Sequence, residues 1–372
     1  MQFVFNSKVM MRVAKHYLLR RTGTHAALYS ITSHISSFCK WLNKQPDTLI
    51  EEYNSQLSAD RAKTISNIRN TIDEYIFYQK NRNLSPTTIN KSVLSINIFF
   101  KINDINLHLN FKMTRKSPWY SSRAITIEEL MKLMATANLR EKVIIGILAV
   151  SGLRLGTLVK LQYRHVKHDL ERGITPLHIG IDPQITKGMY QGYSTFINGE
   201  VTEYLKKYLS NRRKGNRDNE PENINDDSPL IRLHRRGRVE AMSTAAMGGV
   251  IRQVFFQSGI LTKKPKSHAY SYELGTSAFR KFFRTQMAVL RVEPHYIEHM
   301  MGHKNNRYLD VKMVGTECLR QVYKSARISL KPADENERLI ILKQAIEKLG
   351  YSPEAILKPK FLSTFHKSLP SA

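Results

Sequence analysis

The stretch that decides the fold runs from Gly275 to Tyr323 and has the sequence GTSAFRKFFRTQMAVLRVEPHYIEHMMGHKNNRYLDVKMVGTECLRQVY. Its first part carries apolar residues at helical spacing, namely Phe279, Phe282, Phe283, Met287 and Leu290. This pattern predicts an amphipathic helix, for which Thr276 and Ser277 are suitable N-caps. Arg280 and Arg284 lie off the apolar face and are expected to point elsewhere.

A second helix is predicted from Pro294 to Met301, because Gly302 is a typical helix stop. That stop places His303 at an exposed corner rather than inside a packed face. An arginine near one helix start, a histidine at a helix end and a tyrosine shortly afterwards form a set that could surround one phosphate.

These residues resemble a known family. The string FRKFFRTQ, followed by MMGH and then a tyrosine, is similar to the second catalytic motif of the tyrosine recombinase (phage integrase) family, particularly its archaeal-type branch. The first motif of that family is an apolar helix followed by a Thr/Ser-Gly-Leu-Arg turn. A matching segment lies upstream, from Val143 to Arg154, and ends in Ser-Gly-Leu-Arg.

The segment around Arg154 has a physical logic of its own. An apolar helix from Glu141 to Val150 is expected to be buried, and Ser151-Gly152 breaks it. Arg154 then opens a helix predicted from Leu155 to Gln162, where free backbone N–H groups favour an anion. Arginine suits such a site because its planar fork binds two phosphate oxygens and stays charged. Thr157 stands where the family usually has a glutamate.

Charge is the largest compositional signal. The chain has 372 residues, 41% hydrophobic content and a formal net charge of +27. A surplus of this size indicates a polyanionic partner, and double-stranded DNA is the expected one. The longest apolar run, Val143 to Val150, is far shorter than the roughly twenty residues of a membrane span. We therefore expect a cytoplasmic, nucleoid-associated protein with no membrane partner and no signal peptide. Cys39 and Cys318 are expected to be buried thiols.

The predicted fold class is mainly α with a small β-sheet (α+β). Residues 1–111 keep a helical period, with Tyr29, Ile35 and Phe38 on one stripe, and resemble the family's helical core-binding domain. Residues 112–123 form a basic linker, residues 124–330 the catalytic domain and residues 331–372 a helical tail. Candidate DNA contacts are Lys112, Arg115, Lys116 and Arg123 in the linker, Arg235, Arg236 and Arg238 further on, and Arg284. The segment 211–227 is predicted to be a mobile surface insertion because it has almost no apolar residues.

Strand periodicity appears between the two motifs. Leu177, Ile179 and Ile181 alternate, and residues 184–197 predict two further strands around a glycine-containing turn. The family carries a catalytic lysine on a hairpin at this place, and Lys187 is the matching residue. Without the surrounding motifs, a solvent-facing lysine would be the default interpretation.

The resemblance implies the chemistry. A tyrosine would attack the scissile phosphate and leave a 3′-phosphotyrosyl link with a free 5′-hydroxyl. Arg154, Arg280 and His303 would stabilise the transition state, and Lys187 would protonate the leaving oxygen. Ser277 stands where the family has a histidine. No metal or cofactor is implied, and the spacing of His295, His299 and His303 is not interpreted as a metal site.

Two tyrosines are candidates for the nucleophile. Family members commonly place it nine residues after the Gly-His histidine, but here that position is Lys312. Tyr308, in a polar segment near His303, is the first candidate. Tyr323 is the alternative, and its position in a helix from Thr316 to Ser325 also suits a packing role.

The resemblance therefore implies a site-specific DNA recombinase or integrase that assembles on DNA, as a tetramer. Two other functions remain open. A type IB topoisomerase shares the catalytic domain and chemistry, and a DNA-binding protein with impaired catalysis would fit Ser277 and the unusual tyrosine spacing.

Overall fold

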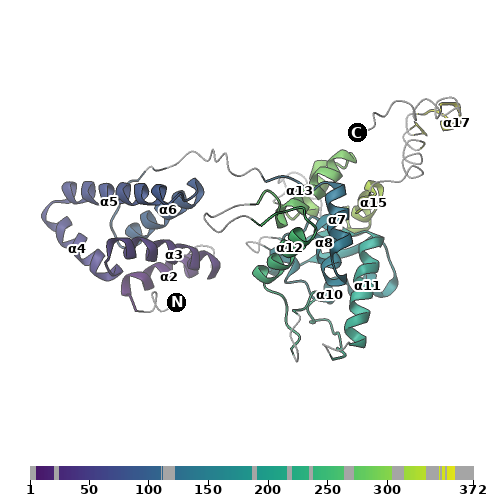
Figure 1. Cartoon of the computed structure of the whole chain (residues 1–372), viewed down its shortest axis with the longest axis horizontal. Coiled ribbons are helices and arrows are strands. Elements are labelled where there is room, and N and C mark those ends of the chain that lie inside the picture. Colours follow the sequence, from purple (N-terminus) through teal and green to yellow (C-terminus); the bar gives the residue numbers. More distant parts are fainter. Residues whose placement is uncertain are drawn as a thin grey trace. The chain divides into compact units, whose positions relative to one another are not determined.

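The computed structural model describes residues 6–20, 25–109, 111, 122–186, 191–215, 220–233, 238–263, 272–303, 314–331, 343, 346–347 and 350–356. The chain divides into two compact units. The first comprises Met1–Ser121 with Lys263–Glu273, and the second comprises Ser122–Thr262 with Leu274–Ala372. Figure 1 shows the helices and strands of both units.

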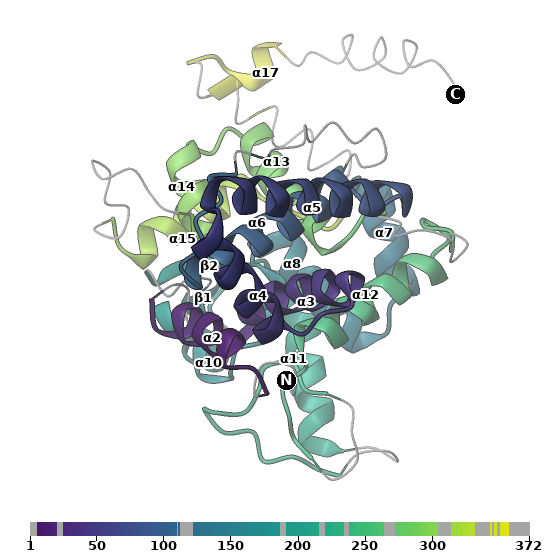
Figure 2. The same cartoon turned by 90° about the vertical axis from the view of Figure 1, so that its left-hand side faces the viewer.

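The first unit is a bundle of helices (Figures 1 and 2). In chain order they are α2 (Lys8–Arg20), α3 (His25–Leu42), α4 (Pro46–Ala59), α5 (Arg61–Asn81) and α6 (Pro86–Ile102). Side-chain caps begin two of them. Asp60 accepts a hydrogen bond from the backbone of Lys63 at the start of α5, and Ser85 accepts one from Thr88 at the start of α6.

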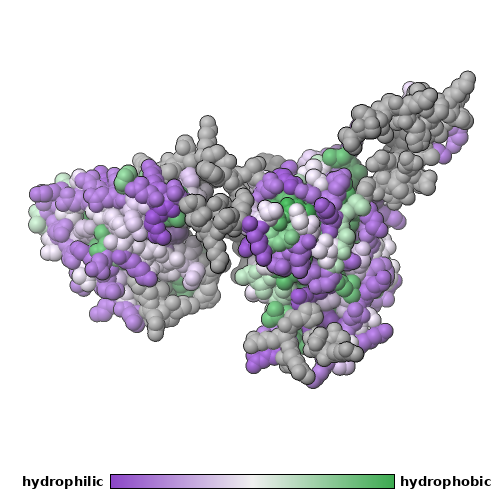
Figure 3. All heavy atoms as spheres, in the orientation of Figure 1, coloured by the Kyte–Doolittle hydropathy of each residue, from purple (hydrophilic) through white to green (hydrophobic). Residues whose placement is uncertain are grey.

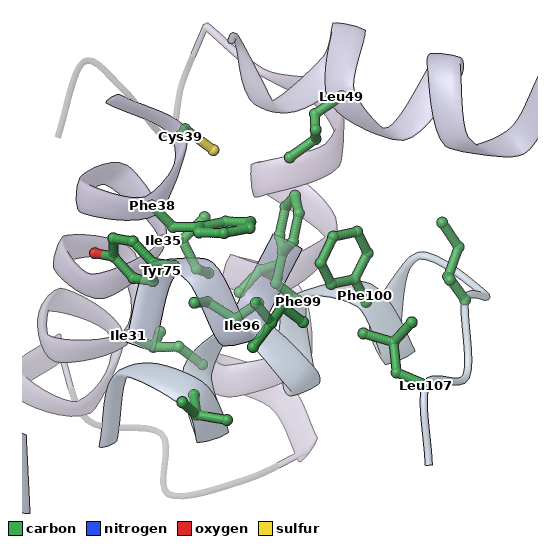
Figure 4. Close-up of a cluster of buried hydrophobic side chains, with 14 of the residues drawn as sticks. Ile31, Ile35, Phe38, Cys39, Leu49, Tyr75, Ile96, Phe99, Phe100 and Leu107 are labelled. Carbon is green, nitrogen blue, oxygen red and sulfur yellow. The ribbon is translucent and has the colours of Figure 1, made fainter. Parts of the chain in front are cut away.

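Aromatic side chains fill the core of this unit (Figure 4). Phe38 of α3 meets Tyr75 of α5 edge-on, with ring centroids 5.1 Å apart, and Phe99 meets Phe100 at 5.3 Å. The four rings are almost completely buried. One predicted member of the α3 stripe is wrong, because Tyr29 is 75% exposed. Cys39 is buried as predicted, and burial raises the pKa of its thiol to about 12.

The second unit is built around the buried helix α8 (Leu139–Ser151). A capping box between Asn138 and Glu141 begins α8, and residues Val143 to Ser151 are all buried. The surrounding helices are α7 (Ile127–Thr136), α11 (Gly199–Lys214), α12 (Thr244–Gln257) and α13 (Thr276–Val289), each in contact with α8 (Figure 1). The burial predicted for this segment is therefore correct, and it gives the unit its central helix.

A two-stranded antiparallel sheet packs against α8. Strands β1 (Leu177–Ile181) and β2 (Tyr193–Ile197) pair so that Leu177 faces Ile197 and Ile181 faces Tyr193. The alternation in β1 is confirmed. The strand predicted next, from residue 184, is wrong within the described residues: Pro183–Ile185 form a 3₁₀ turn (η1), closed by a hydrogen bond from Thr186 N to Pro183 O. Proline favours this turn because its φ is fixed and it has no N–H for a ladder.

Shorter helices complete the second unit. These are α9 (Leu155–Leu158), α10 (Arg164–Arg172), α14 (Pro294–Met300), α15 (Thr316–Ala326) and α17 (Pro353–Ile356). Helix α9 ends sooner than predicted. The N-cap of α13 is Gly275, without a side-chain cap, so Thr276 and Ser277 are the first helical residues instead of caps. Cys318 is exposed on α15, contrary to prediction, because the inner face of this helix carries Leu319, Tyr323 and Ala326.

The segment after α11 is held by buried ion pairs. Glu222 accepts hydrogen bonds from Arg212 of α11 and from Arg232, and the side chains of all three are at most 7% exposed. The described part of the predicted mobile insertion is therefore anchored at Glu222. Burying one carboxylate between two guanidiniums satisfies charges that would otherwise be costly to bury.

The confirmed fold class is mainly helical with one small antiparallel sheet. Hydrophilic residues cover much of the visible surface of each unit (Figure 3). Over the described ranges, no helix has both the length and the apolar content that a bilayer crossing requires.

Candidate active site

The abrupt end of helix α8 positions Arg154. Gly152 caps this helix with a φ of +63°, a conformation that side chains other than glycine rarely adopt. A Cβ at Gly152 would lie 2.4 Å from the Phe283 ring of α13. The glycine therefore permits both the turn and the close approach of α13. Two residues later, Arg154 occupies the N-cap position of α9 with its side chain half-buried.

Arg280 of α13 reaches the same place from another part of the chain. Its Nη1 donates a hydrogen bond to the carbonyl of Gly152, and its Nη2 donates to the carbonyl of Met301 at 2.7 Å. Arg154 Nη1 donates to the carbonyls of Met301 at 3.4 Å and Gly302 at 3.2 Å. The two guanidinium groups are thus held by backbone oxygens from the ends of α8 and α14.

Helix α14 ends in a Schellman motif that positions His303. Gly302 has a φ of +63°, its N–H donates to His299 O at 2.8 Å, and His303 N donates to Glu298 O at 3.0 Å. A Cβ at Gly302 would lie 2.4 Å from the Tyr193 ring of β2. The predicted glycine stop is correct, and it brings His303 beside Arg280, with Nε2 and Nη2 2.7 Å apart.

Glu298 occupies the other side of the histidine. Its Oε2 contacts His303 Nδ1, and its Oε1 accepts a hydrogen bond of 3.0 Å from Arg284 Nε. Burial acts to raise the pKa of Glu298, but the hydrogen bonds from His303 and Arg284 outweigh it and hold this pKa below its ordinary value. The carboxylate therefore stays ionised at neutral pH.

The electrostatics of the cluster favour an anion. Burial, and then the neighbouring charge of Arg154, lower the pKa of Arg280 to about 10. At neutral pH both guanidinium groups are still charged, and within the described ranges no carboxylate forms an ion pair with either. Two half-buried cations without a paired carboxylate form a site that a phosphate oxygen would neutralise.

Tyr193 forms the wall of this site. Its ring packs on Gly302, and its hydroxyl is buried without a hydrogen-bond partner among the residues described. Burial raises its pKa, against smaller opposing effects of Thr157, Arg280 and Arg154. The Thr157 hydroxyl is close enough to lower the pKa of Tyr193, but it does not meet the geometry of a hydrogen bond to the Tyr193 hydroxyl.

The remaining predicted catalytic residues are not part of the described cluster. Ser277 is exposed in the first turn of α13, and in the described part of the chain no hydrogen bond joins it to Arg154, Arg280 or His303. Lys187 and Tyr308 lie outside the described residues.

The alternative nucleophile is packed into the core. Tyr323 of α15 is 1% exposed, and its hydroxyl donates to the carbonyl of Val150 at 2.9 Å. Burial raises the pKa of Tyr323 well above its ordinary value. In this conformation the hydroxyl is closed off from solvent, so an attack on a phosphate would require α15 to move.

Only some of the candidate DNA contacts lie within the described residues. Arg123 pairs with Glu129 of α7 at 2.6 Å, Arg284 pairs with Glu298 with its side chain 60% exposed, and Arg238 lies 3.7 Å from Glu240 with its side chain 67% exposed. The other predicted contacts fall outside the described residues, namely Lys112, Arg115, Lys116, Arg235 and Arg236.

Sequence reasoning missed Glu298, and one signal could have found it. In a Schellman motif the residue after the glycine lies over the residue five positions earlier. Once Gly302 is accepted as the helix stop, His303 is expected to meet Glu298. No comparable local signal points to Tyr193, which reaches the site through strand pairing.

The histidines of α14 are spread over different surroundings. His299 is 3% exposed, and its Nε2 lies 3.4 Å from Ser194 N, whereas the ring of His295 lies 4.0 Å from that of Tyr296. Among the described residues, no three His, Cys, Asp or Glu side chains are grouped so that they could hold a metal ion.

The fold is a mainly helical domain in which two arginines and a histidine lie together at the end of α14. Residues 123–312, just over half of the chain, match the sequence profile of the phage integrase family. The chain belongs to this family.

Solved structures of recombinases are similar over most of the chain. The recombinase XerA is 19% identical, with 87% of this chain and 99% of that one covered and a TM-score of 0.35. The Tn1549 transposon integrase, in complex with transposon right-end DNA, is 18% identical, with 76% and 85% covered and a TM-score of 0.42. A lambda integrase dimer bound to a core site is 14% identical, with 80% and 95% covered and a TM-score of 0.40. No curated protein matches the sequence.

Proposed function

We propose that this protein is a site-specific DNA recombinase or integrase that cuts and rejoins duplex DNA through a 3′-phosphotyrosyl intermediate. One observation carries the proposal: Arg154, Arg280 and His303, from three separate segments of a phage integrase family chain, converge on the end of α14. Such a cluster is suited to the non-bridging oxygens of one phosphate.

The reaction is a transesterification. The tyrosine hydroxyl releases its proton to solvent, and its oxygen forms a bond to phosphorus as the bond from phosphorus to the 5′-oxygen breaks. The leaving oxygen takes a proton, for which Lys187 is proposed as the donor. Arg154, Arg280 and His303 bind the charge that accumulates on the phosphate oxygens in the transition state. The tyrosine proposed first is Tyr308, because the hydroxyl of Tyr323 is buried against Val150.

Further parts of the proposal concern assembly. Residues 1–111 are proposed as a core-binding domain, residues 112–123 as a basic linker, 124–330 as the catalytic domain and 331–372 as a tail. The protein would act on double-stranded DNA as a tetramer, in the cytoplasm and associated with the nucleoid. The strings FRKFFRTQ and MMGH support assignment to the archaeal-type branch. The net charge of +27 supports a polyanionic partner for this chain.

A plasmid experiment tests the function. A supercoiled plasmid carries two copies of the DNA that flanks the gene, and a matched plasmid carries one copy. Exchange products that appear only with two copies are expected. Relaxation of both plasmids without exchange would contradict the proposal and indicate a type IB topoisomerase, whereas tight binding without any strand cleavage would indicate an impaired DNA-binding protein.

A further inference from the structure

Both ring nitrogens of His303 are occupied, and their partners fix where the proton lies. Arginine can only donate, so His303 Nε2 accepts the hydrogen bond from Arg280 Nη2 at 2.7 Å. An ionised carboxylate can only accept, so Nδ1 carries the hydrogen that faces Glu298 Oε2. The network therefore assigns a neutral imidazole with its hydrogen on Nδ1.

Glu298 is itself held in place. The Schellman motif joins His303 N to Glu298 O at 3.0 Å, and Arg284 Nε donates to Glu298 Oε1 at 3.0 Å. These bonds leave Oε2 directed at the imidazole. Because the carboxylate stays ionised, the hydrogen on Nδ1 cannot leave without placing a bare nitrogen lone pair against a negative oxygen.

This arrangement limits what His303 can offer a phosphate. A phosphate oxygen accepts hydrogen bonds, and in the neutral imidazole described above Nε2 has no hydrogen to donate. His303 Nε2 becomes a donor only after it takes up a proton from solvent and releases its bond from Arg280. The resulting imidazolium would keep its Nδ1 hydrogen on Glu298.

We propose that Glu298 is a positioning residue that holds the Nδ1 hydrogen of His303 and balances the imidazolium charge, so that Nε2 donates to a DNA phosphate only when His303 is protonated. The part that concerns DNA rests on the proposed function. The part that concerns the hydrogen on Nδ1 and the charge pairing does not, because it applies to the free protein.

The elements that pack around His303 carry charges of both signs. Glu298 of α14 favours the imidazolium, whereas the three arginines that face the site disfavour it through like charge. The charged and titratable groups that face the site are Glu298 on α14, Arg280 and Arg284 on α13, Arg154 on α9 and Tyr193 on β2. Removing the one negative charge in this set should therefore make protonation of His303 harder.

The test uses nitrogen NMR of the full-length chain with ¹⁵N-labelled histidine. The His303 signals are identified by their loss in His303→Gln. In the wild-type protein at alkaline pH we expect a protonated Nδ1 and a bare Nε2. In Glu298→Gln the amide oxygen can still accept from Nδ1 but the negative charge beside the imidazole is gone, so the midpoint measured for His303 should move to lower pH than in the wild-type protein. Glu203→Gln, which removes an exposed carboxylate of α11, is the matched control and should leave the midpoint unchanged.

Cleavage of a nicked duplex gives the second readout. The alkaline limb of the cleavage rate should move to lower pH in Glu298→Gln by the same amount as the NMR midpoint, and not in Glu203→Gln. A wild-type His303 with its hydrogen on Nε2 at alkaline pH, or an unchanged midpoint in Glu298→Gln, would overturn the inference. If the NMR results are as expected but the wild-type protein cleaves no DNA, the positioning role stands and the proposed function fails.

Discussion

Arg154 and Arg280 donate hydrogen bonds to one and the same backbone oxygen, the carbonyl of Met301. Arg154 caps α9 and Arg280 lies on α13, and the like charges of their guanidinium groups repel each other. Their hydrogen bonds to carbonyls at the ends of α8 and α14 hold them together before any anion is present. Such preorganisation makes electrostatic stabilisation of a transition state effective, because little rearrangement is needed during the reaction.

Arg154→Ala and Arg280→Ala should therefore separate catalysis from binding. We expect each to lower the rate of strand cleavage by about 10²- to 10³-fold, the typical effect of removing one preorganised donor. Duplex affinity should change little, because each arginine would be one of many phosphate contacts in the proposed ground-state complex. Cleavage kinetics and a binding isotherm on the same duplex measure both effects. Arg164→Ala, at an exposed pair with Asp227, is the control. Equal losses of binding and cleavage would mark the arginines as ordinary backbone contacts.

Gly302 should be sensitive to the smallest substitution. Gly302→Ala adds a Cβ at a φ of +63° and 2.4 Å from the Tyr193 ring, so we expect a loss of about 2 kcal/mol in the free energy of unfolding. Urea unfolding measures it. The matched change is Gly249→Ala, inside α12 with no heavy atom within 4 Å of the added Cβ, which should raise stability by about 1 kcal/mol or less. Equal effects of the two substitutions would refute the close approach at Gly302.

The acid stability of the second unit should depend on His178. Burial lowers the pKa of His178 to about 4, below its ordinary value of 6.5, while its Nε2 lies 2.9 Å from Ser194 Oγ. The folded state therefore binds fewer protons than the unfolded state between these values. Its contribution is present above pH 6.5 and is lost as the pH falls towards 4, by up to about 3 kcal/mol.

Unfolding measured across this pH window tests the assignment. His178→Gln should flatten the decline in stability between pH 6.5 and 4, and His295→Gln should not. A decline of unchanged steepness in His178→Gln would show that other groups cause it.

Salt should weaken DNA binding steeply. The net charge of +27 predicts that many counterions are released on binding, so non-specific duplex affinity should fall by about 10³-fold or more between about 50 and 200 mM salt if about six phosphates are contacted. A titration of fluorescent duplex at several salt concentrations gives the slope. A nearly flat response would exclude a broad electrostatic interface.

Local patterns predicted the parts of the site that depend on local structure. The buried run before Arg154 and the glycine stop before His303 are both signals within one helix, and both are confirmed at Gly152 and Gly302. Periodicity also identified Phe279, Phe282, Phe283 and Met287 as the buried face of α13 and placed Arg280 off that face, but it wrongly included Leu290, which caps the helix and is 37% exposed.

Other features depend on contacts between distant segments and left no local trace. Tyr193 lines the site because β2 packs on α14, whereas the burial of Tyr323 against Val150 agrees with the packing role that its position in a helix suggested. Glu222 is a similar case: a polar segment suggested mobility, but two arginines bury its carboxylate. Charge composition alone does not distinguish a solvated carboxylate from a paired one.

The nucleophile gives the most direct test of the central claim, that a tyrosine of this chain cuts DNA. A suicide substrate, a nicked duplex whose cleaved strand diffuses away, traps the covalent complex, and mass spectrometry of the DNA-linked peptide identifies the residue. We expect an adduct on Tyr308 that is absent in Tyr308→Phe and present in Tyr323→Phe. An adduct that persists in Tyr308→Phe and disappears in Tyr323→Phe would move the chemistry to α15. The absence of any tyrosine adduct, from wild-type protein that binds the duplex, would contradict the account.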